Sequence, residues 1–373
     1  MRKIIILAFI LMLIAGSLPA VEVTAEFPGI MYNGTLLPKP SFGDPRDAAL
    51  QEAISGTEEA LRKFDSMNNL ARGFSNANSY ASDAATTRGL MGYKFLTIAV
   101  GTMASLQMPG RFVNTFNDSL SSIAKEGDLY FGAGFHALTL SVGVNAGFLA
   151  DGLYLTGKIG KFSSDIEDLK YDSFVFGLLA SYQLVDPFSI GILKWRGLQA
   201  GSGIVYYESV SITTFEVESV SAPVEFDPDG AGPSGLIETT LYLDPTVTAK
   251  IKSSGFKIPF ELITGIRVFW IANLSFGLGV DMNFAGKSEI ALKADGETSL
   301  GEELSAIEGV TVTPGNINVK SSTKSNGADF LRFRAMAGIG FGLGPLKIDI
   351  PVSYYFDGSG FGTNLGITGA LTL

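Results

Sequence analysis

The clearest pattern along the chain is a two-residue alternation of apolar and polar positions that begins near residue 90 and continues to the last residue. Between residues 256 and 270 most even-numbered positions carry Phe, Ile, Leu, Val or Trp, whereas Lys257, Glu261 and Arg267 are odd-numbered. Because successive side chains of a β-strand point to opposite faces, this period predicts strands with one apolar and one polar face.

The connections between these strands fall into two length classes. Short turns such as Gly344-Pro345 alternate with long polar segments such as 208–235 and 285–327. This layout is typical of barrels that span an outer membrane. We therefore expect an all-β fold, an antiparallel transmembrane β-barrel of about 12 strands (10–14), with both chain ends on the side of the short turns. The expected strands are 93–106, 129–148, 153–161, 173–184, 188–207, 236–243, 246–253, 256–270, 274–284, 329–343, 345–356 and 361–373.

The N-terminus has a different pattern. Arg2 and Lys3 precede an unbroken apolar run that is shorter than the roughly 20 residues of a membrane-spanning helix, which predicts a signal peptide over 1–20. Residues 21–88 are expected to form a linker and an amphipathic helix, and residues 89–373 the barrel.

A helical period appears in residues 45–70, after Asp44 and Pro45, which suit an N-cap and a first helical turn. Apolar residues recur in this helix at spacings of three and four, so they form one face, which has to be buried. We expect it to lie as a plug in the barrel or as a periplasmic segment. Its apolar positions are Leu50, Ile54, Leu61 and Phe64.

Composition supports this fold class. Hydrophobic residues make up 46% of the chain and charged residues 17%, yet after the signal peptide no apolar run is long enough for a helical span. Barrel strands reconcile these facts, because each shows only one face to lipid. The net charge of -10 argues against nucleic acid as a partner. We expect export through the periplasm to the bacterial outer membrane, with lipid and the barrel-assembly machinery as partners.

Charged residues on the polar parity of the strands are expected to face the lumen. They would set the electric field of an open pore or pair with one another across a closed interior. A lumen of about twelve strands is wider than side chains alone can fill, which makes the 45–70 helix a natural plug. The expected lumen-lining charges are Lys257, Glu261, Arg267, Asp281, Arg332, Arg334, Lys347 and Asp349.

Few residues are suited to catalysis or metal binding. The chain has one histidine, His136, and no cysteine, and the neighbours of His136 match no motif of the barrel enzymes that pair a histidine with serine or aspartate. We expect no enzymatic activity, no cofactor and no metal site.

Two family resemblances accompany these patterns. The stretch Arg72 to Met103, RGFSNANSYASDAATTRGLMGYKFLTIAVGTM, resembles the N-terminal region of long-chain fatty-acid transporter barrels. The overall layout is similar to the surface barrels of spirochaetes, some of them grouped with leptospiral surface adhesins. The final strand resembles the terminal recognition strand of outer-membrane barrels, although it ends at Leu373 and not at an aromatic residue.

These observations leave three functional hypotheses. The first is an outer-membrane channel or transporter that passes small or hydrophobic solutes by passive diffusion, with a small solute or lipid-like ligand as its partner. The second is a surface-exposed adhesin or structural barrel that binds host or envelope components through its long loops. The third, a soluble secreted β-sandwich, requires the apolar strand faces to pack beneath a second sheet.

Overall fold

The computed structural model describes residues 21–39, 44–62, 67–86, 93–109, 130–166, 168–216, 219–226, 237–269, 271–302, 304, 307–321, 324–356 and 360–373. The predicted signal peptide, 1–20, lies outside the described residues. In the described part of the chain, neither helix is both long and apolar enough to cross a membrane.

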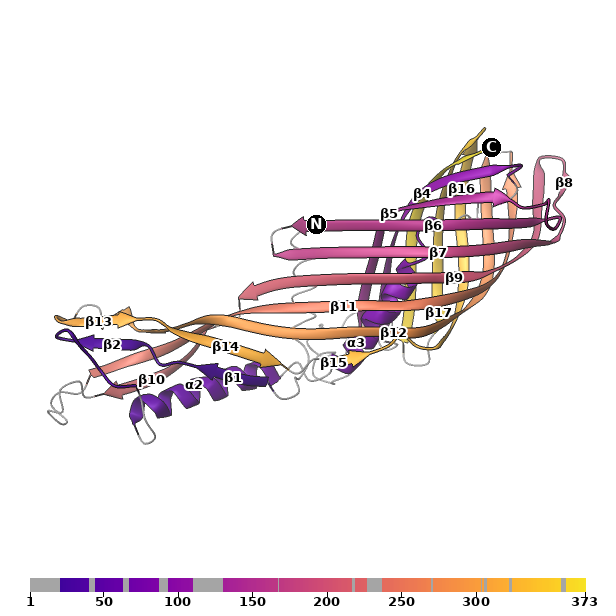
Figure 1. The fold of residues 1–373 in the computed structure, drawn as a ribbon. Helices are drawn as coiled ribbons and strands as arrows, with labels where there is room; N and C mark the ends of the chain where they lie inside the picture. Colours follow the sequence, from indigo (N-terminus) through magenta and orange to yellow (C-terminus); the bar gives the residue numbers. More distant parts are fainter. Residues whose placement is uncertain are drawn as a thin grey trace.

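Ten antiparallel strands pair in a closed ring, in the order β4-β5-β6-β7-β9-β11-β12-β16-β17-β18, with β18 returning to β4 (Figure 1). The prediction of an all-β, antiparallel barrel is confirmed. The strands of the ring are β4 (Leu96–Pro109), β5 (Gly132–Asn145), β6 (Leu153–Ile166), β7 (Leu169–Val185), β9 (Leu193–Glu216), β11 (Ile237–Val268), β12 (Ala272–Leu300), β16 (Leu331–Leu343), β17 (Leu346–Phe356) and β18 (Gly360–Thr372).

The ring has ten strands, and not the twelve laid out from the sequence, because three expected strands, 236–243, 246–253 and 256–270, form the single strand β11. The expected turn at Asp244-Pro245 lies inside it. Pro245 pairs with Gly296 of β12, but on its other side the pairing with β9 starts at Thr246 and the pairing with β10 (Val220–Phe226) ends at Leu243. The missing N–H of the proline therefore costs no ladder hydrogen bond.

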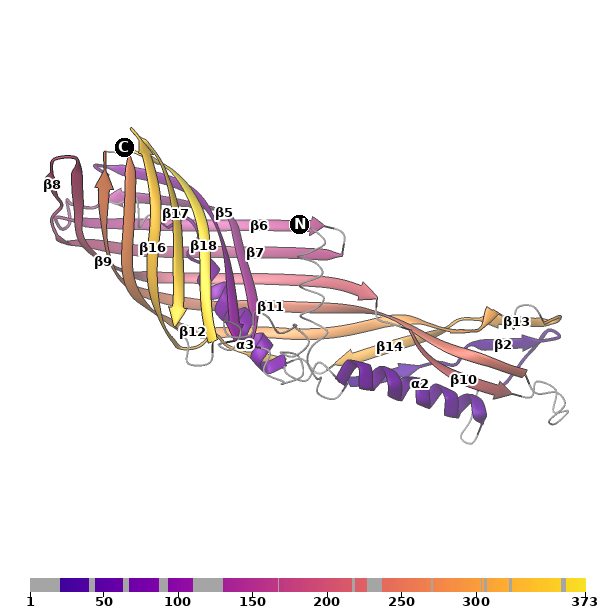
Figure 2. The ribbon, with the colours of Figure 1, turned by 180° about the vertical axis from the view of Figure 1, so that it is seen from behind.

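The two ends of the ring differ. At the short-turn end, β5 connects to β6, β11 to β12 and β16 to β17 by short turns, the small strand β8 (Phe188–Ile190) joins β7 to β9, and the C-terminus lies beside the start of β4. At the opposite, loop end, β11 and β12 continue far beyond the other strands (Figures 1 and 2).

The outer face of the ring is apolar and uncovered. Leu278 is 66% exposed, Leu365 58% and Phe333 54%. No second layer of the described chain covers these side chains, so the sandwich hypothesis is wrong. Exposed apolar side chains on this scale require lipid as their solvent.

Two rows of aromatic side chains mark the limits of this apolar band. At the loop end the rings of Tyr206, Phe256 and Phe284 contact one another, with centroids 5.1 and 5.8 Å apart. At the short-turn end Phe269 and Phe341 are exposed. The stretch from Phe256 to Phe269 spans roughly 30 Å at about 3.3 Å per residue and a tilt near 45°, which matches the hydrocarbon core of a bilayer.

Beyond the loop-end row, β12 separates from β16 after Met282, while β9 still pairs with β11 as far as Thr246, and the parts of β11 and β12 past this row form what we call the lobe (Figure 1). The pairing register of β11 shifts between Ser254 and Phe256, and Ala285 of β12 has a φ of 51°. Such a bulge bends a strand pair. The expected loop 285–327 therefore contains the end of β12 and β13 (Val310–Thr313), β14 (Gly315–Ser321) and β15 (Lys324–Asn326).

The lobe has its own hydrophobic core. The chain segment before the barrel supplies β1 (Val21–Ala25), β2 (Gly29–Tyr32), β3 (Thr35–Leu36) and α2 (Pro45–Arg62), of which β1 pairs with β14 and β2 with β13. α2 packs on β10, β1 and β11. The core combines the inner faces of these elements with Leu70, Ala71 and Phe74 from the helix that follows α2, and it includes Val23, Ala49, Leu50, Ala53, Val224, Leu241, Leu243, Val247, Ile290, Leu292, Ile317 and Val319.

A second helix, α3 (Met67–Ala81), lies inside the ring (Figure 2). It contacts six of the ten strands of the ring, β4, β5, β9, β11, β12 and β18, and also β15. The single helix expected over 45–70 is thus replaced by two described helices with different surroundings, α2 in the lobe and α3 in the lumen.

Candidate functional site: the plugged lumen

α3 fits the lumen because its residues and those of the facing wall are small. A side chain added at Gly132 of β5 would come within 2.1 Å of the backbone of Gly73, and one added at Gly134 within 2.7 Å of the backbone of Ala77. Helix and wall therefore approach to backbone contact, which only glycine permits. Ser105 of β4 also donates a hydrogen bond to the carbonyl oxygen of Ala77 at 2.5 Å.

Asp83, in the turn that follows α3, is the centre of a buried ion-pair network. Its Oδ1 accepts a hydrogen bond from Lys257 Nζ at 2.7 Å, and its Oδ2 accepts one from Arg334 Nη1. The side chains of Lys257 and Arg334 are fully buried, and that of Asp83 is 2% exposed. Two strands that flank β12, β11 and β16, thus hold the same carboxylate of the plug.

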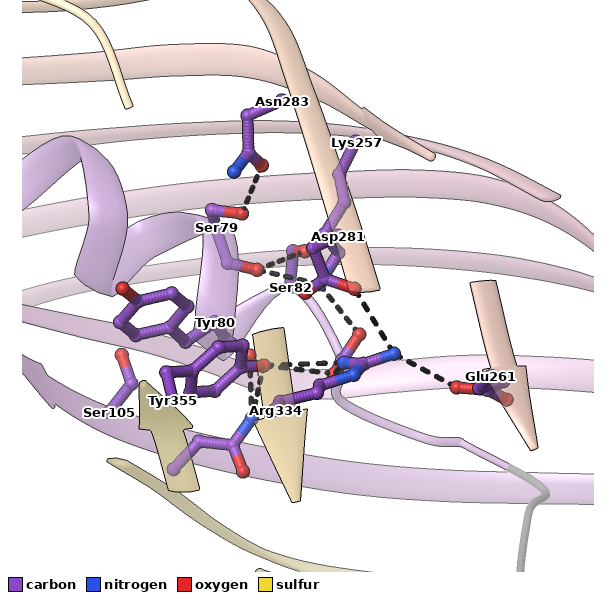
Figure 3. A network of polar contacts seen from close by, with 12 residues as sticks. Ser79, Tyr80, Ser82, Ser105, Lys257, Glu261, Asp281, Asn283, Arg334 and Tyr355 are labelled. Atoms are coloured by element: carbon purple, nitrogen blue, oxygen red, sulfur yellow. Dashed lines mark hydrogen bonds and ion pairs between the residues drawn. The ribbon is translucent and has the colours of Figure 1, made fainter. Parts of the chain in front are cut away.

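The network continues along the wall (Figure 3). Arg334 Nη2 lies 2.9 Å from Glu261 Oε2 and 3.2 Å from Asp281 Oδ1, and Lys257 Nζ also lies 3.7 Å from Asp281 Oδ2. Each of these charges faces at least one opposite charge, as buried ions require. Figure 3 also shows the stacking of Tyr355 on Tyr80 of α3, with ring centroids 3.7 Å apart.

A second polar cluster holds the start of α3 near the loop end. Asp329 pairs with Arg72 of α3 and with Arg332 of β16. Its Oδ2 accepts hydrogen bonds at 2.8 Å from Asn76 Nδ2 and from the hydroxyl of Tyr130. Polar groups therefore tie α3 to the wall at both ends, and at its start Leu70, Ala71 and Phe74 also pack into the hydrophobic core of the lobe.

The sequence-predicted charges occupy two levels of the lumen. Lys257, Glu261, Asp281, Arg332 and Arg334 belong to the two clusters that hold the plug. Arg267, Lys347 and Asp349 lie nearer the short-turn end, where Arg267 Nε donates to Asn273 Oδ1 at 3.0 Å. In the register of the ring, Asp349 pairs with Gly340, which pairs with Asn273.

The residues predicted as the apolar face of a plug lie elsewhere. Leu50 is buried in the lobe core and Ile54 packs against that core. Phe64 and the side chain of Leu61 lie outside the described residues. The physical reason is that the lumen is polar, so an apolar helix face finds its partners in the lobe.

Reasoning from the sequence missed the plug residues Asp83, Asn76 and Tyr80 and the wall residues Lys158 and Asp329. Lys158 of β6 donates to the carbonyl oxygen of Ser82 at 2.5 Å. A signal was present in the run SNANSYASDAA over residues 75–85, in which small and polar residues surround a single carboxylate.

A pocket of about 440 Å³ opens at the short-turn end. Its lining is mostly polar, with Lys194, Arg196 and Arg267 as cations, Asp151 and Asp186 as anions, and Gln183, Gln199 and Tyr154 among the neutral groups. Between it and the plug lies a smaller pocket that includes Asp83, Gln199 and Glu261. The two pockets therefore lie between the short-turn end of the barrel and the plug.

His136 lies on β5 with 1% of its surface exposed, and its Nε2 has no hydrogen-bond partner within the described ranges. Over the same ranges, no group of three or more His, Asp and Glu side chains is arranged to hold a metal ion.

Comparison with known proteins gives one family and several distant folds. A protein-family model described as Lsa36-like matches residues 41–371. No curated protein matches the sequence. Similar solved structures include the translocator domain of the autotransporter NalP from Neisseria meningitidis (10% identity, 80% of this chain and 99% of that chain, TM-score 0.30). Others are the toluene transporter TbuX of Ralstonia pickettii (10%, 81% and 95%, 0.25) and a FadL homologue of Pseudomonas aeruginosa (9%, 81% and 95%, 0.24).

Proposed function

Since the chain belongs to the Lsa36-like family and its ring of strands encloses a polar helix, we propose that it is an outer-membrane transporter in which α3 is a movable plug. The family match confirms the resemblance to leptospiral surface-type barrels. The observation that carries the proposal is the polar attachment of α3 within the lumen, where Asp83 and Asp329 hold it, whereas only its first turns pack on the lobe core, through Leu70, Ala71 and Phe74.

The polar contacts between α3 and the wall allow the plug to move at a low cost in free energy. Ser75, Asn78, Ser79 and Ser82 of the plug are buried against a wall that is itself rich in polar groups. Water can satisfy both surfaces once they separate, so the net loss per hydrogen bond is only about 0.5–1.5 kcal/mol. A lumen of ten strands is wider than the eight-stranded interior that side chains fill, so displacement of α3 leaves a water-filled path.

The pocket at the short-turn end favours small polar solutes over hydrophobic ones. Its cations, anions and amides line the space that a solute would occupy between the short-turn end and the plug. A hydrophobic solute would leave these groups without hydrogen-bond partners, which costs about 1–3 kcal/mol for each buried group.

Engineered cysteines test the movement of α3, because the chain has no cysteine of its own. The hydroxyl oxygen of Ser79 and Oδ1 of Asn283 are 2.6 Å apart, so Ser79→Cys/Asn283→Cys tethers α3 to β12 on oxidation. The matched control is Ser253→Cys/Ser288→Cys, whose hydroxyl oxygens are also 2.6 Å apart but which joins two strands, β11 and β12, and does not tether α3.

We expect planar-bilayer recordings to show channel openings for the reduced tether variant and for both states of the control, and no openings for the oxidised tether. Asp83→Asn, which removes the charge held by Lys257 and Arg334, should raise the open probability at least tenfold. A folded protein that conducts equally with the tether closed, or that never conducts even as Asp83→Asn, would refute the movable plug.

The lobe favours a second candidate function, binding of host or envelope components at the cell surface. β11 extends from Phe256 to Ile237 beyond the aromatic row, roughly 60 Å at about 3.3 Å per residue. Lys250 and Lys293 are exposed on its outer face. We expect Lys250→Glu/Lys293→Glu to weaken adhesion of expressing cells to immobilised basement-membrane extract, and Lys194→Glu, near the short-turn end, to leave it unchanged.

A further inference from the structure

The segment before the barrel connects the two ends of the ring. At the short-turn end, the amide groups of Phe95 and Leu96 donate to the carbonyl oxygen of Leu373 at 2.9 and 3.2 Å, so β4 starts beside the C-terminus. At the loop end, β1 pairs with β14, and α2 packs on β10. α3 lies in the lumen between these points, so residues 21–62 and the start of β4 lie on opposite sides of the membrane.

We propose that the barrel is the export route of its own N-terminal segment: residues 21–62 pass through the lumen to the outer surface, and α3 stays behind as the last part to enter. The orientation follows from the short turns and the C-terminal strand, which face the periplasm in outer-membrane barrels. This corrects the expectation that both chain ends lie on the periplasmic side. The inference depends on this orientation and not on transport by the mature protein.

The lumen has the width that a single helix needs and little more. Gly132 and Gly134 of β5 touch the backbone of α3, and a side chain added at Gly101 of β4 would come within 2.7 Å of the backbone of Ala85. A chain can pass such a lumen extended or as one helix, whereas a folded domain cannot.

In the lobe, the exported segment completes a hydrophobic core. Leu241, Leu243 and Ile290 are fully buried in the lobe core, and the segment contributes Val23 of β1 and Leu50 of α2 to the same core. Without residues 21–62, an apolar sheet face would stand exposed to water. Burial of that face favours the outward position of the segment, at about 25 cal/mol per Å² of apolar surface.

Single cysteines in this cysteine-free chain report the position of the segment. Ser55→Cys on α2, Lys250→Cys on the lobe face of β11 and Ala150→Cys in the β5–β6 turn all replace exposed residues. Intact cells are treated with a membrane-impermeant maleimide, with permeabilised cells as reference and the heat-sensitive gel mobility of the folded barrel as control.

We expect the cysteines at 55 and 250 to react fully on intact cells, and the cysteine at 150 only after permeabilisation. Reaction at 250 but not at 55 on intact cells would overturn the surface location of the segment. Reaction at 150 alone would reverse the orientation and overturn the proposal.

A folded insert distinguishes passage through the lumen from closure of the barrel around the segment. A small disulfide-closed domain is inserted at the exposed Asn33-Gly34 turn in the Ser55→Cys background, and its Cys→Ser version, which stays unfolded, is the matched control. Passage predicts that the unfolded insert leaves residue 55 reactive on intact cells and that the closed insert abolishes the reaction. Equal reaction with both inserts would refute passage through the lumen.

Discussion

The two halves of the β11–β12 pair have the same backbone pairing and opposite chemistry. In the ring, the lumen-facing side carries Lys257 and Glu261, and the outer side carries Phe260 and Leu262, which are 47% and 48% exposed. In the lobe, the inner side carries Leu241, Leu243 and Val247, all buried, and the outer side carries exposed Lys250 and Lys252.

The inversion takes place at the bulge between Ser254 and Phe256. This inversion shows that the surroundings of each strand face, lipid, water or protein, determine whether its residues are polar or apolar. Lipid outside demands apolar residues outside and leaves the interior free to be polar, whereas water outside demands the reverse, with an apolar core between sheet and helix.

The largest expected effect on stability comes from replacing a lysine by methionine, once in the ring half of β11 and once in its lobe half. Lys257→Met removes a fully buried ammonium group from Asp83 and Asp281, and should lower the free energy of unfolding by about 3–5 kcal/mol. Lys250→Met, on the exposed side of the lobe, should change it by less than about 0.5 kcal/mol. Urea unfolding in lipid vesicles measures both, and equal losses would contradict the distinction between the two environments.

A charge placed on the outer face sharpens the comparison. Leu278→Arg sets a guanidinium near the middle of the lipid band and should cost about 2–4 kcal/mol. Thr246→Arg places the same group on the water-exposed outer face of the lobe and should be neutral within about 0.5 kcal/mol. The same vesicle assay applies, and tolerance of arginine at 278 would argue against lipid contact there.

Removal of one methylene tests whether protein or lipid surrounds a side chain. Ile251 is 3% exposed in the lobe core, so Ile251→Val should leave a cavity and cost about 0.5–1.5 kcal/mol. Ile258 faces outward, where lipid chains fill the space, so Ile258→Val should cost less. Protease resistance of the lobe and urea unfolding of the barrel provide the readouts, and a larger loss at 258 would reverse the assignment.

The smallest effect concerns the start of α2 in the lobe. Hydrogen bonds from the Arg46 side chain lower the pKa of Asp44 below its ordinary value. This ion pair therefore stabilises the lobe above the ordinary pKa of aspartate, about 3.9, and the contribution is lost as the pH falls through the lowered pKa. Asp44→Asn keeps a capping side chain and should cost less than about 1 kcal/mol at pH 7 and less at pH 2 than at pH 7. Thermal melting of the lobe at both pH values measures the difference, and a loss of the same size at pH 7 and pH 2 would assign the effect to capping.

The sequence predicted the barrel because two-residue alternation survives in every lipid-facing strand, and it predicted the start of α2 because Asp44 and Pro45 suit an N-cap and a first turn. The observed ten strands lie within the predicted range of 10–14, but the layout of twelve divided β11 into three strands. Asp244-Pro245 resembles a turn, and only the pairing shows that this proline lies in the gap between β9 and β10. The buried apolar face of the lobe also has the same period as a lipid-facing strand.

The plug could have been anticipated from the lumen charges. Lys257 and Arg334 predict a polar interior, and a helix inside it has to be polar and small, as residues 75–85 are. Amphipathicity favoured 45–70 instead, because an apolar face is the usual signal of a packed helix. The pairing of Asp83 with Lys257 and Arg334, which are far apart in the sequence, depends on three-dimensional proximity, which no spacing along the chain encodes.

The central claim is that β11 passes from lipid to water between Ser254 and Phe256. Single spin-labelled cysteines at outward positions 246, 248, 250, 252, 258, 260, 262 and 266, compared for accessibility to oxygen and to a water-soluble nickel chelate in vesicles, test it most directly. We predict that oxygen dominates from 258 to 266 and nickel from 246 to 252, with the crossover at the bulge. Nickel accessibility at 260 and 262, or oxygen dominance at 250 and 252, would contradict it.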